Sequence, residues 1–330
     1  MALLVFISLL ISRSKTIPFT FTQLLTTISK GSSTSGTSSL NTTQCIADPD
    51  WIYNMHQWTY KKGPHSQGSQ DLYLEKIFQV ISPTNKYFVE FGFNEPNYST
   101  KGSGANTHNL YEKGWRGLLL DGAHENKMIN LKKYYLFANN IASIFAENNV
   151  PKEPDFISCD MDSHDLWVFR SILQAGYRPR IITTEFNTNY HITDALTLLD
   201  PTINCSDSLP KNFRFQFQGC AWGASAGALR IVAEAHGYTM VGRVSVLDLI
   251  WMRNDLLKDC FRIPPFEWFF RNVRIGTLHH RLVSSPDVLT QIVDYATYVR
   301  TLSIGKSNAA ARAILKSRNL SCFQNVKRFL

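Results

Sequence analysis

The sequence predicts an α/β fold built around a doubly wound, mostly parallel sheet. At 330 residues the chain is long enough to bury a full core. Apolar runs of about four to eight residues alternate with helical patterns of about 10 to 15 residues. The runs are nearly continuous in apolar residues, which is typical of parallel strands that are covered on both faces.

The first half of this pattern begins with a helix in which Leu74, Ile77 and Phe78 return to one face. Ser69 precedes it as a candidate N-cap, and Pro83 ends it. The elements predicted here are, in order, a helix at 70–81, a strand at 87–92, a helix at 106–114 and a strand at 116–122.

The second half continues the alternation and then closes the sheet. The predicted elements are an amphipathic segment at 124–135, a strand at 154–162, a helix at 163–176, a strand at 179–187, a helix at 223–237, and closing strands at 238–244 and 245–251. The remainder is predicted to be mainly helical. Its clearest helix is at 285–302, with Ser285 as a candidate cap and Pro286 in the first turn.

The chain divides by composition into four parts. These are a hydrophobic leader at 1–15, a disordered Ser/Thr/Gly-rich linker at 16–49, the α/β domain at 50–255, and a basic, mainly helical extension at 256–330. No run of apolar residues has the length of a full membrane span.

The leader favours a location in the secretory pathway, in the Golgi or endoplasmic reticulum lumen or outside the cell. Its apolar run at 2–11 has the length of a signal-peptide core, and it is also a candidate membrane anchor. However, Arg13 and Lys15 follow the run instead of preceding it, and no acidic residue occurs before Asp48. An organellar transit peptide and a truncated start are therefore the alternatives. Sequons at four asparagines give weak support for a glycoprotein: Asn41, Asn97, Asn204 and Asn319.

Basic charge is concentrated near the end of the chain. Residues 261–330 hold eleven Lys and Arg against three Asp and Glu, and this excess equals the net charge of +8. A solvated helix face is the ordinary interpretation, and an acidic glycan or phosphate partner is the alternative. We expect a small-molecule or glycan substrate and no nucleic acid partner. Six widely spaced cysteines without a CxxC motif argue against a zinc site of the usual cysteine type, and Cys159 reads as a buried thiol.

Carboxylates follow the strongest predicted strands. In a doubly wound sheet the ligand lies beyond the carboxyl ends of the strands, where the strand order reverses. This geometry places four groups along one edge: Glu90 to Asn94, Asp121 with Gly122, Asp160 to Asp162, and Glu185 to Asn187. Together they predict a polar cofactor site.

Asp121 and the single glycine after the first strand predict which cofactor binds. A carboxylate that ends the second strand accepts hydrogen bonds from ribose hydroxyls. A dinucleotide would need a GxGxxG loop for its pyrophosphate, but here only Gly92 follows Glu90. S-adenosylmethionine has no phosphate, and one glycine that permits close approach suffices for it. Gly92 therefore favours S-adenosylmethionine.

A set of segments, in this order and spacing, resembles the FkbM-type S-adenosylmethionine-dependent methyltransferases over roughly residues 65–255. The segments are SQGSQDLYLEKIF, FVEFG, NTHNLYEKGWRGLLLDG, VPKEPDFISCDMDSHDLWVF, YRPRIITTEFN and GASAGALRIVAEAHGY. The resemblance implies a class I, Rossmann-like methyltransferase fold and O-methylation of a hydroxyl.

The resemblance also implies roles for single residues. Glu90 and Gly92 match the first cofactor motif, with Asn94 in the same loop, and Asp121 with Gly122 matches the ribose-binding motif. Further matches are Asp160 and Asp162 at the end of the fourth strand, and Ser66, Gln67, Gln70 and Asp71 in the motif that leads into the first strand. The chain departs from the family at Glu95-Pro96, where an Asp-Gly pair is usual, and in a shortened third strand.

Methyl transfer to a hydroxyl needs a base or a metal ion to activate the oxygen. The predicted catalytic residues are Asp160, Asp162 and His164, with His191 in reserve. Oxygen ligands from Asp160, Asp162, Glu185 and Asn187 form a candidate site for a divalent cation such as Mg²⁺. Two alternatives remain: a lumenal glycosyltransferase that uses Asp160-Met161-Asp162 for a metal and a sugar nucleotide, and an inactive methyltransferase-like binding protein.

Overall fold

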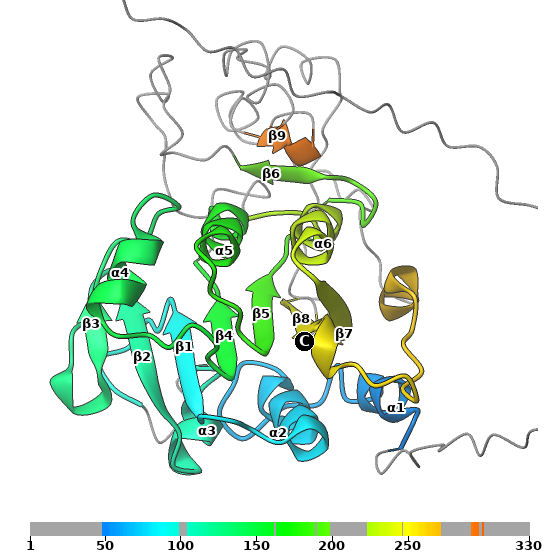
Figure 1. The fold of residues 1–330 in the computed structure, drawn as a ribbon, viewed down its shortest axis with the longest axis horizontal. Helices are drawn as coiled ribbons and strands as arrows, with labels where there is room; N and C mark the ends of the chain where they lie inside the picture. Colours follow the sequence, from blue (N-terminus) through cyan, green and yellow to red (C-terminus); the bar gives the residue numbers. More distant parts are fainter. Residues whose placement is uncertain are drawn as a thin grey trace, which may run out of the picture. The chain divides into compact units, whose positions relative to one another are not determined.

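The computed structural model of the chain describes residues 48–98, 104–161, 163–188, 190–198, 223–245, 247–271, 292–296 and 299. Their main feature is a seven-stranded sheet (Figure 1). Its strands are β1 (Tyr87–Phe91), β2 (Arg116–Asp121), β3 (Leu131–Lys133), β4 (Phe156–Cys159), β5 (Ile181–Glu185), β7 (Tyr238–Val244) and β8 (Asp248–Arg253).

The strand order is β3-β2-β1-β4-β5-β8-β7. All pairs from β3 to β5 are parallel, whereas β8 is antiparallel to both of its neighbours. The order reverses between β1 and β4, because the chain moves outward in one direction from β1 and in the other from β4. The predicted doubly wound, mostly parallel sheet is therefore confirmed.

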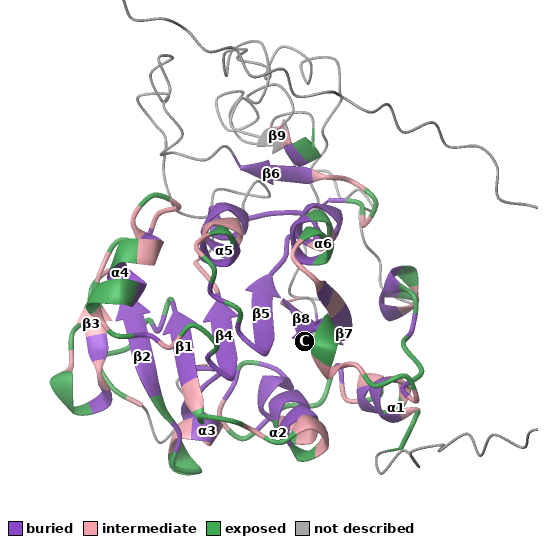
Figure 2. Ribbon diagram, viewed as in Figure 1, coloured by how far each residue is buried: buried purple, intermediate pink, exposed green. Residues whose placement is uncertain are grey.

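Helices cover both sides of the sheet (Figure 1). One side carries α2 (Gln70–Ile81) and α3 (His108–Glu112), and the other carries α4 (Ile141–Glu147), α5 (Asp165–Gln174) and α6 (Ala226–Ala235). The remaining elements are α1 (Trp51–His56), the 3-10 turns η1 (Lys127–Ile129), η2 (Asn254–Leu256) and η3 (Phe266–Phe270), and a separate strand pair, β6 (Leu196–Leu198) with β9 (Ile292–Asp294). The strands are almost wholly buried, as Figure 2 shows, which explains their continuous apolar sequences.

Helix α2 forms where the periodicity predicts it, with Leu74, Ile77 and Phe78 buried. Ser69 lies at the N-cap position, but its hydroxyl donates to the Thr59 carbonyl and caps no helix amide. The predicted helices at 106–114, 163–176 and 223–237 and the closing strands are also present, as α3, α5, α6, β7 and β8.

The amphipathic segment at 124–135 does not form a helix. The Asn126 side chain accepts a hydrogen bond from the Met128 amide, which starts the short turn η1, and Asn130 ends it in the left-handed conformation. The chain then enters β3, where Leu131 is fully buried. The amphipathic spacing of this segment does not belong to one element, since Met128 in η1 is 88% exposed and Leu131 lies in β3.

The helix predicted at 285–302 is wrong at residues 292–294, which form β9 and pair antiparallel with β6. Residues 295, 296 and 299 are helical. Pairing with a distant strand outweighs local helical periodicity in this stretch, because propensity yields to tertiary contacts.

The beginning of the C-terminal extension packs on the sheet domain. Phe261, Phe266, Phe269 and Phe270 belong to the hydrophobic core, and the buried Arg243 of β7 donates from Nε to the Phe269 carbonyl at 2.7 Å. The division into four parts stays a prediction.

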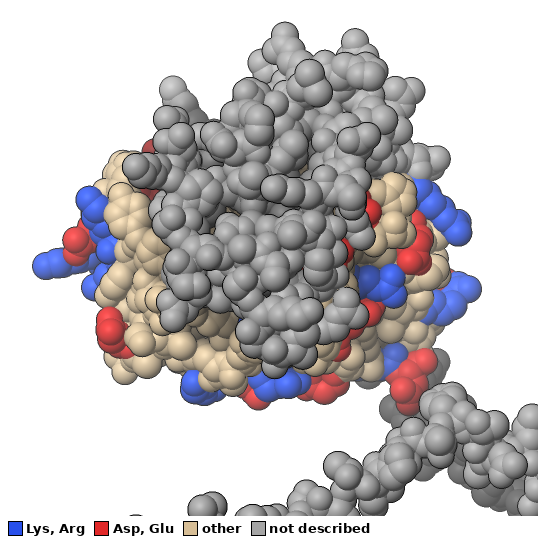
Figure 3. Space-filling view, turned by 90° about the horizontal axis from the view of Figure 1, so that it is seen from above, with Lys and Arg blue, Asp and Glu red and all other residues tan. Residues whose placement is uncertain are grey.

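Several predictions concern residues outside the described ranges, among them the leader, the linker, most of the basic tail and Asp162. The secretory location thus stays a prediction. None of the helices in the described part of the chain has the length and apolar character needed to cross a bilayer. Cys159 is a buried free thiol, as expected, and Cys260 is disulfide-bonded. On the face shown in Figure 3, basic and acidic side chains are interspersed around the margin of the described surface.

Candidate functional site

A cavity of about 1180 Å³ opens at the carboxyl ends of β1, β2, β4 and β5, where the strand order reverses. Its charged lining residues are nearly all acidic. They are Glu90, Glu95, Asp121, Asp160, Glu185 and Asp248, together with His164, and no Lys or Arg is found among the described residues that line it. The cavity therefore favours a cationic ligand group over an anionic one.

Gly92, which directly follows β1, is confined by a neighbouring strand end. Its φ is +63°, and a Cβ atom at this position would lie 2.2 Å from the carbonyl oxygen of Asp160. The sequence suggested that a cofactor approaches this backbone, but within the described structure the close neighbour is the loop after β4. Gly92 allows these two loops to meet at the wall of the cavity.

Glu90 lies one residue before the end of β1 and organises the start of α3. Its Oε1 accepts a hydrogen bond from the Asn106 amide at 2.6 Å, and its Oε2 accepts from the Thr107 amide at 3.1 Å and from the Thr107 hydroxyl. Burial raises the pKa of Glu90 to about 7, although these hydrogen bonds oppose the shift. Glu90 lines the cavity, as predicted, but its hydrogen bonds hold the loop that leads to α3.

The raised pKa of Glu90 predicts a pH-dependent stability. Between the ordinary pKa of 4.5 and the folded value of about 7, the native state binds a proton that the unfolded state has lost. Stability from this group is fully present below pH 4.5 and is lost as the pH rises to 7. Relative to Glu90→Gln, which cannot titrate, the wild type should lose about 3 kcal/mol of unfolding free energy between pH 5 and pH 8.

Urea denaturation of both proteins at the two pH values measures this difference. Glu125→Gln is the matched control, since it makes the same substitution at an exposed carboxylate. Parallel pH profiles of the wild type and Glu90→Gln would show that Glu90 does not titrate in this range.

Asp121 at the end of β2 is ionised and heavily hydrogen-bonded. Oδ1 accepts from the Ala123 amide and from the amide and Nδ1 of His124, whereas Oδ2 accepts from the Asn94 amide at 2.8 Å. Burial alone would raise the pKa of Asp121, but the backbone hydrogen bonds outweigh it and hold the pKa below its usual value. Oδ2 takes a single hydrogen bond from the described residues, so it is the oxygen with room for a ribose hydroxyl.

The two other residues of the predicted cofactor set also line the cavity. Asn94 has a φ of +62°, which turns its amide toward Asp121. Gly122 lies against the ring of Tyr135, where a Cβ atom would come within 3.3 Å of a ring carbon. The apolar part of the wall includes Leu120, Leu136 and Phe137, which are neighbours of the sort that an adenine ring needs.

The candidate cation site contains two of its four predicted ligands. Oxygen atoms of Asp160, Glu185 and Asp165 all lie within 4.8 Å of one another. Asp162 lies outside the described residues, and Asn187 is fully buried two residues after Glu185. Asp165, at the start of α5, was not predicted. Its carboxylate also accepts hydrogen bonds from the Met161 and Ser163 amides, and so shapes the loop that carries Asp160.

The two histidines proposed as bases have different surroundings. His164 lines the cavity, but its Nε2 bonds to the Leu136 carbonyl at 2.7 Å and its Nδ1 to the Ser163 hydroxyl at 2.9 Å. Because a carbonyl only accepts, Nε2 carries the proton, and the other nitrogen faces a hydroxyl. His164 is therefore better suited to positioning the loop than to taking a proton. His191 is exposed, bonds to Thr193, and is not among the cavity residues.

Asp248, which was not predicted, extends the site together with Gln70 of the motif that leads into the first strand. Asp248, at the start of β8, is paired in register with Glu185 and accepts a hydrogen bond from Gln70 Nε2 at 2.7 Å. Burial raises the pKa of Asp248 to about 6, against the hydrogen bonds from Gln70 and Asn106. In the sequence, Asp248 is visible only as an acidic residue inside an apolar strand. It reaches the site because β8 is antiparallel to β5, so the start of β8 lies beside the carboxyl end of β5.

No protein-family model matches the chain, and no curated protein matches it significantly. Among solved structures it is similar to one described as "MycE Methyltransferase from the Mycinamycin Biosynthetic Pathway in Complex with Mg, SAH, and Mycinamycin VI", with 16% sequence identity and a TM-score of 0.34. The match covers 63% of this chain and 56% of that chain, so it spans little more than half of the neighbour's length. A similarity of this size carries no argument about activity, and the resemblance to the FkbM-type family stays a prediction.

Proposed function

We propose that this protein is an S-adenosylmethionine-dependent O-methyltransferase that acts on a hydroxyl of a sugar, a glycan or a similar small polar acceptor. The observation that carries the proposal is the acid-lined cavity at the point where the strand order reverses. S-adenosylmethionine carries a sulfonium cation and no phosphate, so carboxylates attract its reacting centre. A dinucleotide or a sugar nucleotide would bring a diphosphate to the same walls and be repelled.

Different residues around the cavity bind the different parts of the cofactor and the acceptor. Asp121 holds the ribose through Oδ2, and the apolar wall beside Gly122 takes the adenine. The methionine portion lies by the loop of Gly92 and Asn94. The acceptor approaches from the side of Asp160 and Glu185, both of which line the cavity.

The reaction is an in-line displacement. The acceptor oxygen forms a bond to the methyl carbon while the carbon–sulfur bond breaks, its electron pair neutralises the sulfonium, and the hydroxyl proton passes to a base. Asp160, a carboxylate that lines the cavity beside Glu185, is the base in this proposal. A divalent cation held by Asp160, Asp165 and Glu185 would lower the pKa of a bound hydroxyl, and the all-oxygen ligand set suits Mg²⁺.

Isothermal titration calorimetry with the purified chain tests the proposal. S-adenosylmethionine and S-adenosylhomocysteine should bind, and UDP-sugars should give no heat. Asp121→Asn, which keeps the shape of the side chain and removes its charge, should weaken binding by at least about tenfold, because hydrogen bonds to charged groups contribute about 1.5 to 3 kcal/mol. Asp194→Asn is the control, since Asp194 is not among the described cavity residues.

Three outcomes would contradict the proposal. Heat with UDP-sugars alone would favour the glycosyltransferase alternative. Tight cofactor binding without methyl transfer to any member of a glycan and small-molecule panel would favour a binding protein. No heat with either class of ligand would exclude both nucleotide-dependent activities.

A further inference from the structure

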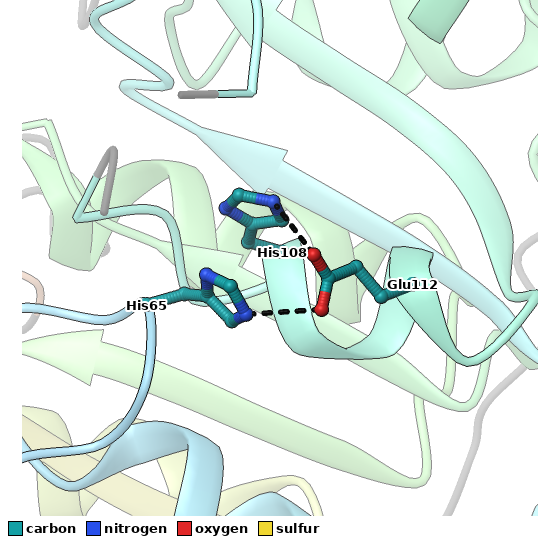
Figure 4. Close-up of side chains that lie close together, drawn as sticks. All are labelled: His65, His108 and Glu112. Atoms are coloured by element: carbon teal, nitrogen blue, oxygen red, sulfur yellow. Dashed lines mark hydrogen bonds and ion pairs between the residues drawn. The ribbon is translucent and has the colours of Figure 1, made fainter. Parts of the chain in front are cut away.

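A second cluster of metal-ligand side chains lies outside the set of residues that line the cavity. His65, His108 and Glu112 come from two segments and converge on one another (Figure 4). His65 Nε2 lies 3.0 Å from Glu112 Oε2, and His108 Nε2 lies 3.6 Å from Glu112 Oε1. One ligand atom from each of the three residues lies within 4.8 Å of the other two.

Local structure brings these side chains together. His108 and Glu112 are one helical turn apart on α3, so both side chains lie on the same face of the helix. His65 lies in the loop before α2, where the Asp71 carboxylate accepts hydrogen bonds from the amides of His65 and Ser66. A bridge between Ser66 and Gly104 attaches this loop to the segment that enters α3.

The imidazole rings are held close to each other. Their centroids are 3.9 Å apart, with an angle of 33° between the planes, and both rings present Nε2 to the same carboxylate. Three buried polar atoms of this region have no hydrogen-bond partner among the described residues, namely Nδ1 of His65, Nδ1 of His108 and Oδ1 of Asp71. Buried polar atoms in native proteins are nearly always satisfied, so these atoms indicate bound water beside the cluster, whereas the two Nε2 atoms and the Glu112 carboxylate are the groups that face one another.

We propose that His65, His108 and Glu112 form a binding site for a divalent transition-metal ion, of which Zn²⁺ is the best match. Zinc binds imidazole nitrogen at about 2.0 to 2.1 Å and carboxylate oxygen at about 2.0 to 2.2 Å in tetrahedral geometry, which places its ligand atoms roughly 3.3 Å apart. The 3.0 Å between His65 Nε2 and Glu112 Oε2 is close to this value, and one ligand atom from each of the three residues lies within 4.8 Å of the others, so small side-chain shifts would complete the site. Two nitrogens and one oxygen also suit Zn²⁺ better than Mg²⁺ or Ca²⁺, which prefer oxygen ligands.

The site joins two loops at the edge of the cavity. Two cavity residues belong to these loops: Gln67, two residues after His65, and Gly104, which forms the bridge with Ser66. A metal ion at this site would tie the loop before α2 to α3, in addition to the bridge between Ser66 and Gly104. Three protein ligands leave one position of a tetrahedral ion to water.

The test uses the full chain after removal of metal by a chelator. Titration with Co²⁺, followed by visible absorbance, and competition with Zn²⁺ should show one equivalent bound. Glu112→Gln should weaken binding of both ions by at least about tenfold, as loss of an inner ligand exceeds the 10- to 100-fold cost of outer-shell changes. The Glu112 side chain is 55% exposed, so this substitution should preserve the fold.

Two control variants define the site. His236→Ala removes a histidine that bonds to the Val232 carbonyl and is not in the cluster, and it should bind like the wild type. Asp160→Asn, in the cavity, should also keep the Zn²⁺ affinity. Zn²⁺ should raise the melting temperature of the wild type and not of Glu112→Gln.

Equal affinities of the wild type and Glu112→Gln, or loss of binding in Asp160→Asn instead, would place the metal elsewhere and overturn the proposal. Failure of the wild type to bind either ion at micromolar concentration would overturn it as well. None of these measurements depends on methyltransferase activity, so they do not decide the proposed function.

Discussion

Replacement of Asp155 by alanine is expected to lower the free energy of unfolding by about 3 to 5 kcal/mol, the usual cost of breaking a buried ion pair from one side. Asp155 is fully buried at the start of β4. Its carboxylate accepts hydrogen bonds from the amides of Thr84, Asn85 and Lys86, from the Thr84 hydroxyl and from Arg180 Nη1, at 2.7 to 2.9 Å. The substitution leaves these donors without their acceptor, at the place where β1, β4 and β5 begin.

Asp255→Ala is the matched control. Asp255 bonds to Arg253 at 2.6 Å, but its side chain is 56% exposed, so its removal should cost no more than about 1 kcal/mol. Urea denaturation at pH 7 gives both values, and equal losses would show that burial does not set the strength of the Asp155 interactions.

Acid should reduce the difference between the wild type and Asp155→Ala. Burial alone would raise the pKa of Asp155, but the hydrogen bonds from Arg180, Thr84 and Lys86 outweigh it and lower the pKa. Stability from a carboxylate with a lowered pKa is present above its unfolded value of 3.8 and is lost as the pH falls through the folded value.

The sheet was predictable because its strands are buried on both faces. A strand between two layers of helices, such as Leu118 to Leu120, is buried at every position. It is therefore visible in the sequence as a continuous run of apolar residues. Local periodicity predicted the wrong secondary structure where contacts with a distant segment determine it. Residues 292–294 are a strand only because β6 lies beside them, and nothing in their own sequence shows that partner.

The candidate site was predictable in position and only partly in detail. The carboxyl ends of parallel strands meet at one edge, so Glu90, Asp121, Asp160 and Glu185 could be brought together from strand order alone. The hydrogen-bond partners of these carboxylates could not be predicted, because they lie in loops without regular secondary structure. The second site, with His65 and His108 separated by 42 intervening residues, had no spacing that a sequence pattern could show.

Gly92→Ala should have the largest effect on the candidate site. The added Cβ would lie 2.2 Å from the Asp160 carbonyl oxygen, and the φ of +63° strains any side chain. Overpacking and left-handed strain each cost about 1 to 3 kcal/mol, so the loss of unfolding free energy should be roughly 2 to 6 kcal/mol. The loops after β1 and β4 must separate to relieve the contact. This separation should lower the affinity for S-adenosylmethionine by at least about tenfold, under the proposed function.

Gly114→Ala is the control that has the backbone strain without the close contact. Gly114 has a φ of +83°, and its added Cβ would meet no neighbouring atom within 4 Å, so only the left-handed strain of about 1 to 3 kcal/mol remains. Denaturation and calorimetric titration of both variants give the comparison. If the two alanines cost the same stability, the approach of Asp160 to Gly92 has no energetic consequence. If Gly92→Ala is destabilised but binds the cofactor normally, Gly92 is needed only for the packing of the loops after β1 and β4 and takes no part in the cofactor site.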